Sequence, residues 1–220
     1  MTEDVAGPES DHSHVALILL RGVEDLPDNV SGWIAGSLDA TPFNSDWKNP
    51  ENFDQKLRRL NDLVDQEKVS GKEIIFIGVS AGGGLGMAYI LAHPDIVRHL
   101  FSLNGLVDPN LPVNAGGGHM AELCRDNPSF KEMSELLTNK LHLPDGEVND
   151  AVIERFRLKE IVSTYSSGPG DEIVPWSVSE PSWVIKKHRV GPGKHAISIA
   201  RMLVLDLREQ LDQLKKARFD

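Results

Sequence analysis

The chain of 220 residues contains a single cysteine, Cys124, so an internal disulfide bond is excluded. This low cysteine content indicates a reducing compartment, and we expect a cytoplasmic protein. One thiol cannot build a cysteine-rich metal site, and the histidine and acidic residues are not grouped at metal-ligand spacing. We therefore expect no metal and no other cofactor.

Long apolar runs and excess positive charge are also missing. The apolar run near the start, Val15–Leu20, is too short to span a membrane and follows acidic and polar residues rather than basic ones. The formal net charge is −10 and the pI is about 5.3, which argues against nucleic acid as the main partner. The sequence thus predicts neither a membrane span nor a nucleic-acid partner, and it leaves the oligomeric state open.

The remaining composition is that of a globular protein with one core. Apolar residues make up 40% of the chain and charged residues 25%, which are ordinary fractions, and the length suits one domain. Residues 1–13 show no periodicity, so we expect a mobile tail there. Residues 14–220 are expected to form a single domain.

The sequence around Ser80 indicates chemistry. An apolar strand at residues 74–77 leads directly into Gly-Val-Ser-Ala-Gly at 78–82, and apolar residues at 85–92 predict a buried helix. Strand, G-x-S-x-G and helix in this order are typical of a nucleophile elbow, where a serine stands on a sharp turn between glycines. The alternatives are a glycine-rich turn without chemistry and a phosphate-binding loop, whose usual motifs are absent.

Strands and helices are expected to alternate along the chain. The helix before the elbow should begin at Asn49-Pro50-Glu51 and end at Gly71. A long amphipathic helix, residues 200–214, should close the chain. This alternation predicts an α/β fold: a doubly wound, mainly parallel sheet flanked by helices. The expected strands are Val15–Leu20, 33–35, 74–77, Val97–Leu103, 161–165 and 183–185.

Residues 106–160 depart from the alternation of strands and helices. Methionine and leucine spacing there predicts two short amphipathic helices, and residues 152–158 predict a third. We expect this segment to form a small helical lid, although plain helical packing would give the same pattern.

An elbow serine needs a base and an acid that orients the base. Asp171 lies in a glycine- and proline-rich loop after the strand at 161–165, where the sites of open α/β sheets form. His195 follows Gly-Pro-Gly-Lys, between the last strand and the last helix. The order serine, acid, histidine is the chain order that accompanies a nucleophile elbow.

Other residues could take these roles. Glu172 is adjacent to Asp171 and is the weaker choice, and Asp108 also follows a strand and is the second candidate for the acid. His188 lies in a basic run that is typical of a solvated surface. His119 falls in the expected lid, where it would contact substrate or solvent.

Four segments together resemble the α/β-hydrolase superfamily, as a compact member similar to serine esterases and thioesterases. They are residues 19–23 (Leu-Leu-Arg-Gly-Val), 78–83, 168–175 and 191–195, which span most of the chain. The resemblance implies Ser80 as nucleophile, His195 as general base and Asp171 as the residue that orients it. It also implies that the backbone N–H groups of Val23 and Ala81 form the oxyanion hole. Many members have histidine at the position of Arg21.

The expected function is that of a serine hydrolase. It would cleave an ester or thioester of a small to medium apolar acyl group through an acyl-enzyme on Ser80. The alternatives are a non-catalytic module that binds a ligand or protein on the same fold, and a hydrolase that acts on a peptide or C–C bond.

Overall fold

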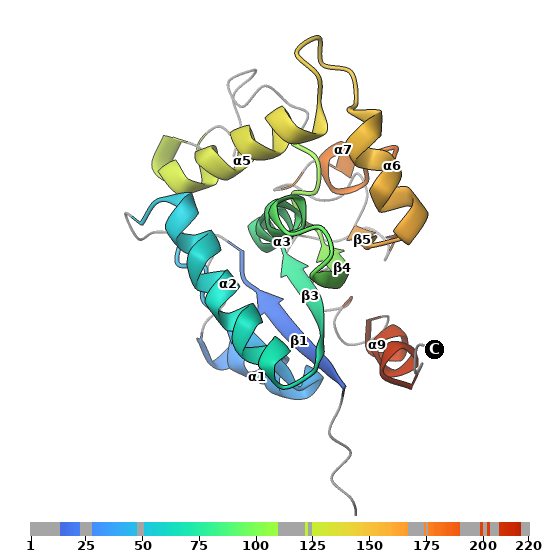
Figure 1. Cartoon of the computed structure of the whole chain (residues 1–220). Helices are drawn as coiled ribbons and strands as arrows, with labels where there is room; N and C mark the ends of the chain where they lie inside the picture. The colour runs from blue at the N-terminus through green and yellow to red at the C-terminus, as the bar shows by residue number, and fades with distance from the viewer. Residues whose placement is uncertain are drawn as a thin grey trace, which may run out of the picture.

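A parallel sheet of six strands organises the part of the chain that the computed structural model describes (Figure 1). The described residues are 14–22, 28–47, 51–109, 122, 125–166, 174, 176–189, 199, 202 and 207–216. In spatial order the strands are β2 (Ala40–Phe43), β1 (Val15–Leu20), β3 (Glu73–Val79), β4 (Val97–Leu103), β5 (Val162–Ser166) and β6 (Lys186–Arg189). The predicted doubly wound, parallel α/β fold is therefore confirmed.

Helices cover both faces of this sheet. They are α1 (Asp28–Leu38), α2 (Phe53–Val69), α3 (Ala81–Ala92), α5 (Pro128–Leu141), α6 (Asp150–Lys159), α7 (Trp176–Ser179) and α9 (Leu207–Lys216). Alternate residues of β1 join different apolar clusters: Ile18 belongs to the cluster that includes residues of α2, α3, α5 and α6, and Leu17 to the cluster that includes residues of α1 and α9. Successive residues of a strand point to opposite faces of the sheet. Because helices cover both faces, β1 and β3 are almost wholly apolar.

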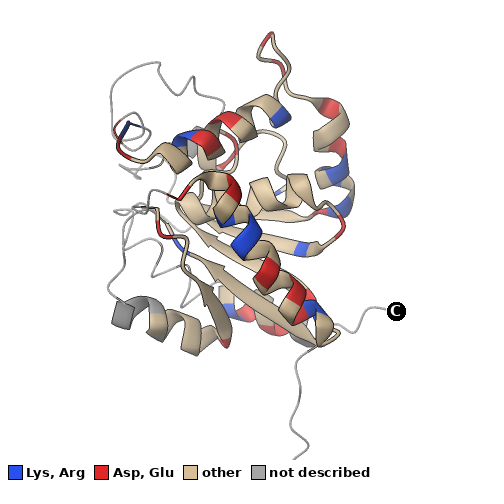
Figure 2. Ribbon diagram, turned by 60° about the vertical axis from the view of Figure 1, so that its left-hand side comes forward, with Lys and Arg blue, Asp and Glu red and all other residues tan. Residues whose placement is uncertain are grey.

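The central helix is α3, which is almost completely buried. The lid candidate α5 packs directly on it. The closeness is shown at Gly84, where an added Cβ atom would lie 2.8 Å from Met133 Cε. Charged residues of both signs lie along the outer helices, whereas the strands at the centre of the sheet have almost none (Figure 2). The layers seen in Figure 1 thus follow the hydrophobic pattern of the sequence.

Two of the expected strands were wrong. Residues 33–35 belong to α1, where Ile34, Ala35 and Leu38 are buried at helical spacing. The neighbour of β1 on the side away from β3 is β2. This strand contains Pro42, as is typical of a strand at the edge of a sheet.

Residues 183–185 are not the last strand either. Trp183 and Val184 are buried by packing, but pairing with β5 begins only at Lys186, in the basic run. An edge strand made of charged residues gives no apolar signal, and such residues are typical of exposed edges.

The start of α2 also differs from the prediction. Asn52, not Asn49, caps the helix: its side chain accepts from Gln55 N, while the Gln55 side chain accepts from Asn52 N. Asn49 and Pro50 lie outside the described residues. Of the three helices expected at 106–160, two appear as α5 and α6; the remaining one, near Met120 and Leu123, falls on residues outside the described part, which lacks 110–121, 123 and 124.

Candidate active site

Ser80 stands at the turn between β3 and α3, in an unusual backbone conformation. Its φ is 53° and its ψ is −122°, which corresponds to the first central residue of a type II′ turn, a position dominated by glycine. A serine held in this region stores strain of order 1–3 kcal/mol and persists only where the surrounding structure enforces it. The predicted strand, turn and helix are thus present around a strained serine.

Two glycines make this turn possible. A Cβ atom at Gly82 would lie 2.1 Å from Leu20 O, and one at Gly78 would lie 2.6 Å from Gly83 Cα. Neither neighbour is a flexible side chain, so only glycine fits at these two positions. Both glycines of the G-x-S-x-G motif are therefore explained by close backbone approach.

The backbone of Ser80 is fixed by its neighbours. Ser80 N donates to Leu103 O (3.0 Å), and Ser80 O accepts from Gly83 N (3.0 Å) and from Leu106 N (3.1 Å). The side chain is partly exposed and makes no capping hydrogen bond to α3. Because α3 begins at Ala81, the N–H of Ala81 has no intrahelical acceptor and the positive end of the helix dipole lies beside the serine.

The segment after β1 lies directly against the serine. A Cβ atom at Gly22 would lie 2.9 Å from Ser80 Cβ and 3.4 Å from Ser80 Oγ. Arg21 and Gly22 are described, whereas Val23, the expected second contributor to the oxyanion hole, lies outside the described residues. The structure therefore brings Ser80, Ala81 and the start of the expected oxyanion loop together.

Asp108, the second candidate for the acid, is occupied by other partners. It lies five residues beyond β4 and is 4% exposed. His142 Nε2 lies 2.6 Å from its Oδ1, and Trp183 Nε1 donates to its Oδ2 at 2.7 Å. No hydrogen bond between this group and Ser80 is found in the described part of the chain. Asp108 thus ties the end of β4 to the end of α5 and to the segment before β6.

The expected acid and base are Asp171 and His195, and both lie outside the described residues, as do Glu172 and His119. His188 lies on β6, where its ring stacks on Tyr165 with centroids 4.5 Å apart.

A buried carboxylate that the sequence did not single out joins the ends of β5 and β6. Glu180 is 5% exposed and accepts hydrogen bonds from the Arg189 guanidinium (3.0 and 3.1 Å) and from Ser166 Oγ. The Glu180 carboxylate raises the pKa of Arg189. Ser166 and Arg189 are the last residues of the strands that precede Asp171 and His195. No local pattern marks Glu180, because this contact is tertiary.

In the described ranges, no three His, Cys, Asp or Glu side chains are grouped closely enough to hold a metal ion. Among the helices of those ranges, none combines the length and apolarity that a membrane span would need.

No protein-family model matches the sequence, and no curated protein does. Solved structures do resemble it. They include a pyrethroid hydrolase from Sphingobium faniae JZ-2 (16% identity, TM-score 0.54, 92% of this chain and 98% of that one). An α/β-hydrolase enzyme from the metagenome of Mar Chica lagoon sediments has 14% identity and a TM-score of 0.52 over 92% and 90% of the two chains. A lipase-esterase related protein from Clostridium acetobutylicum has 16% identity and a TM-score of 0.51 over 93% and 95%. These likenesses, together with the strand order and the turn at Ser80, show that the chain has the α/β-hydrolase fold.

Proposed function

We propose that the protein is a serine hydrolase that cleaves a carboxylic ester or thioester of a small to medium apolar acyl group. The observation that carries this proposal is the backbone of Ser80, held at φ 53° and ψ −122° between β3 and α3. The fold does not need a serine there, since glycine would adopt the same conformation without strain. A strained, partly exposed hydroxyl beside a helix N-terminus is what an activated nucleophile requires.

The reaction would proceed in two halves. Ser80 Oγ attacks the acyl carbon while His195 takes the hydroxyl proton, and Asp171 orients the imidazole. The oxyanion is held by the N–H groups of Ala81 and Val23. His195 then gives the proton to the departing alcohol or thiol, which leaves the acyl-enzyme. Water attacks this acyl-enzyme with His195 again as base, and the carboxylic acid is released with free Ser80.

Two further observations support this assignment. Asp108 is engaged by His142 and Trp183, so Asp171 remains the proposed orienting acid. Helices α5 and α6 lie on the same side of the sheet as α3, and we propose that they form the lid over an apolar acyl group (Figure 1). Several structural neighbours are named as hydrolases, esterases or lipases, which is consistent with ester chemistry.

Labelling with a fluorophosphonate probe tests the proposal. The wild-type protein should react once, at Ser80, and Ser80→Ala should abolish labelling and lower kcat by about 10⁶-fold, as in another serine hydrolase. Circular dichroism should show an unchanged fold. A panel of acyl esters and thioesters of graded chain length, with peptide and C–C substrates as comparison, then identifies the bond. Equal labelling of Ser80→Ala would reject the nucleophile, and a labelled wild type without turnover would favour a binding module.

A further inference from the structure

One backbone carbonyl near Ser80 is held unusually firmly. The Arg21 carbonyl oxygen accepts hydrogen bonds from Ser45 Oγ and from Trp47 Nε1, each at 3.1 Å. Both donors come from the segment 44–47, which follows β2 and is called here the clamp segment. Ser45 is 0% exposed and Trp47 is 3% exposed, so both donors are shielded from water.

The carbonyl lies close to the proposed catalytic serine. Arg21 directly precedes Gly22, whose hypothetical Cβ would be 2.9 Å from Ser80 Cβ. A Cβ at Gly82 would be 3.1 Å from Arg21 O, so the same carbonyl also packs against the first turn of α3. The clamped peptide is therefore in contact with both sides of the turn that holds Ser80.

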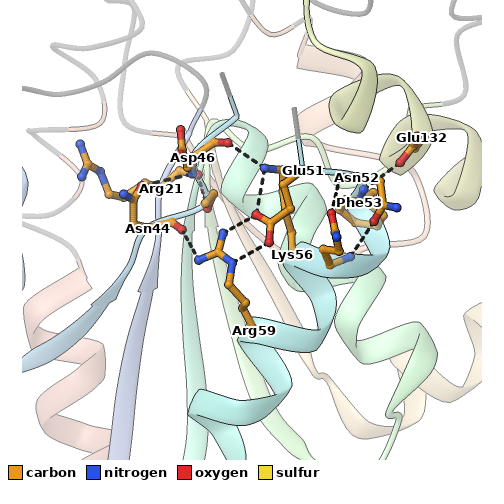
Figure 3. Close-up of polar contacts among 11 residues, drawn as sticks. Arg21, Asn44, Asp46, Glu51, Asn52, Phe53, Lys56, Arg59 and Glu132 are labelled. Atoms are coloured by element: carbon orange, nitrogen blue, oxygen red, sulfur yellow. Dashed lines mark hydrogen bonds and ion pairs between the residues drawn. The ribbon is translucent and has the colours of Figure 1, made fainter. Parts of the chain in front are cut away.

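The clamp segment is anchored in turn by the first two turns of α2 (Figure 3). Lys56 Nζ donates to Asp46 O at 2.7 Å, and Arg59 Nη1 donates to Asn44 O at 3.3 Å. Glu51 joins the two cations: it forms two hydrogen bonds with Arg59 (2.7 and 2.9 Å) and lies 3.6 Å from Lys56 Nζ. The carbonyls on either side of Ser45 are thus fixed by charged donors.

Burial makes this anchor costly to disturb. The side chain of Lys56 is fully buried, and this burial lowers its pKa. The hydrogen bond from Arg59 lowers the pKa of Glu51 and so keeps the carboxylate ionised beside the lysine. Lys56 also lies over the Trp47 ring at 5.9 Å from its centroid, and Phe130 of α5 packs edge-on against the same ring. The indole is therefore held on two sides.

We infer that Ser45 and Trp47 are positioning residues that fix the Arg21–Gly22 peptide, which leads into the expected oxyanion loop, against Ser80. This inference rests on the proposed function for its chemical meaning. Because the peptide unit is planar and trans, two hydrogen bonds to the Arg21 carbonyl fix the peptide plane that continues into Gly22. An oxyanion hole accelerates a reaction only if its N–H donors are in place before charge develops, and the clamp holds the peptide that precedes the expected donor of this loop.

Hydrogen exchange measures the positioning itself, independently of turnover. Ser45→Ala removes one donor, and Trp47→Phe removes the indole N–H but keeps an aromatic ring. In each variant the amides of a peptide that covers residues 19–24 should exchange about tenfold faster than in the wild type. Ser37→Ala is the matched control, since its Oγ also donates to a backbone carbonyl, that of Ile34, on α1. It should leave exchange at 19–24 unchanged.

Kinetics then connects the clamp to the oxyanion. With p-nitrophenyl butyrate, Ser45→Ala and Trp47→Phe should each lower kcat about tenfold, while KM stays within twofold of the wild type. An alkyl trifluoromethyl ketone, which forms an oxyanion on Ser80, should lose affinity by the same factor as kcat/KM. A ground-state analogue such as the corresponding alcohol should bind all variants equally.

The possible failures are distinct. If exchange at residues 19–24 is unchanged in both variants, the clamp does not position the loop and the inference is overturned. If exchange rises while kcat and ketone affinity stay at wild-type values, the loop is clamped but carries no oxyanion contact, and the inference is again wrong. A wild-type protein without turnover or labelling of Ser80 refutes the proposed function instead.

Discussion

The ends of β3 and β4 pair side by side, yet their polar residues are used in opposite ways. Each strand is followed by a residue with positive φ, Ser80 at 53° and Asn104 at 44°. Asparagine is among the few residues that tolerate such a φ, whereas serine at ψ −122° occupies a position dominated by glycine. Unexplained strain therefore occurs only at the first of these two strand ends, and strain is what marks a functional site.

The side chains at the two strand ends also differ in how fully they are hydrogen-bonded. At the end of β3 the hydroxyl of Ser80 is partly exposed and caps nothing. Beyond β4, Asp108 is buried and each carboxylate oxygen has a close partner, one from His142 and one from Trp183. We interpret the satisfied, buried carboxylate of Asp108 as a structural element, and we propose that the strained, partly exposed hydroxyl of Ser80 is the reactive group. Substitutions at the two ends should accordingly affect different quantities, turnover at β3 and stability at β4.

The largest expected effect separates two histidines. His195→Ala should lower kcat by about 10⁶-fold, because the nucleophile loses its base. The wild-type rate should fall on the acid side with an apparent pKa of about 6 to 7, since a general base must be neutral.

His142→Gln should keep kcat within about tenfold but lower the free energy of unfolding by about 1–3 kcal/mol, because Asp108 loses a buried partner. If His142→Gln is folded but inactive while His195→Ala keeps its activity, the roles assigned to these two histidines are reversed. His188→Ala, on β6, serves as the activity control.

The two candidate acids should differ by a smaller factor. Asp171→Asn should lower kcat by about 10⁴-fold with an unchanged melting temperature, because His195 would be left in the wrong tautomer. Asp108→Asn should keep most of the turnover and lose stability, because the amide N–H₂ that replaces one carboxylate oxygen would face the donor on His142 or the one on Trp183. Thermal unfolding and initial rates measured on both variants test this. If Asp108→Asn is the inactive variant and remains folded, the catalytic acid follows β4 and the functional division between the strand ends is wrong.

Steric pressure on the end of β3 should cost less. Gly22→Ala would place a Cβ 2.9 Å from Ser80 Cβ and 3.1 Å from Val79 O, so the serine must shift by some tenths of an ångström. A misplaced nucleophile costs rate, and we expect kcat to fall about 10²-fold. Gly36→Ala on α1 is the matched control, because nothing lies within 4 Å of its Cβ. That change should leave kcat unaffected and raise helix stability by about 0.5–1 kcal/mol. Equal kcat values for both variants would mean that the close approach at Gly22 is irrelevant to turnover.

The sequence was informative where structure depends on local chemistry. The turn at Ser80 needs glycine two residues before and two residues after it, and the close contacts of Gly78 and Gly82 explain why. The strands β1 and β4 were predicted with their correct bounds, because β1 is apolar on both faces and β4 carries a run of largely apolar residues that ends at Leu103. Fold class follows from such segments, since their alternation with helices permits few topologies.

The sequence was misleading where tertiary contacts decide. An apolar run at 183–185 is buried as packing, while the neighbouring basic run forms β6, since an edge strand needs backbone pairing rather than apolar side chains. Ser45 and Trp47 reach a carbonyl 24 and 26 residues away, and Glu180 joins two strand ends. No spacing rule connects such residues, so the clamp and the Glu180 contact could be found only in the folded chain.

The smallest expected effect concerns His99, a residue of β4 far from the chemistry proposed for Ser80. Its side chain is buried, with Nε2 2.9 Å from Ser163 Oγ and the ring tilted by 52° against the Phe101 ring at a centroid distance of 4.4 Å. Burial first, and then the positive charges of Lys186 and Arg98, lower the pKa of His99 to about 3. Its ordinary pKa in the unfolded chain is about 6.5.

The sign of the pH effect follows from these two pKa values. Between pH 6.5 and pH 3 the unfolded chain binds a proton at His99 and the folded chain does not, so stability falls as the pH falls. From pH 7 to pH 5 the loss should be about 2 kcal/mol, roughly a 30-fold change in the unfolding equilibrium. His99→Gln should remove this part of the acid sensitivity, whatever its stability at pH 7, and should leave kcat unchanged at neutral pH.

Urea unfolding at pH 7 and pH 5 measures the difference, with His14→Gln, at an exposed histidine, as the control. If His99→Gln loses as much stability as the wild type on acidification, β4 does not carry the acid sensitivity; if it loses turnover instead, the functional division between β3 and β4 fails.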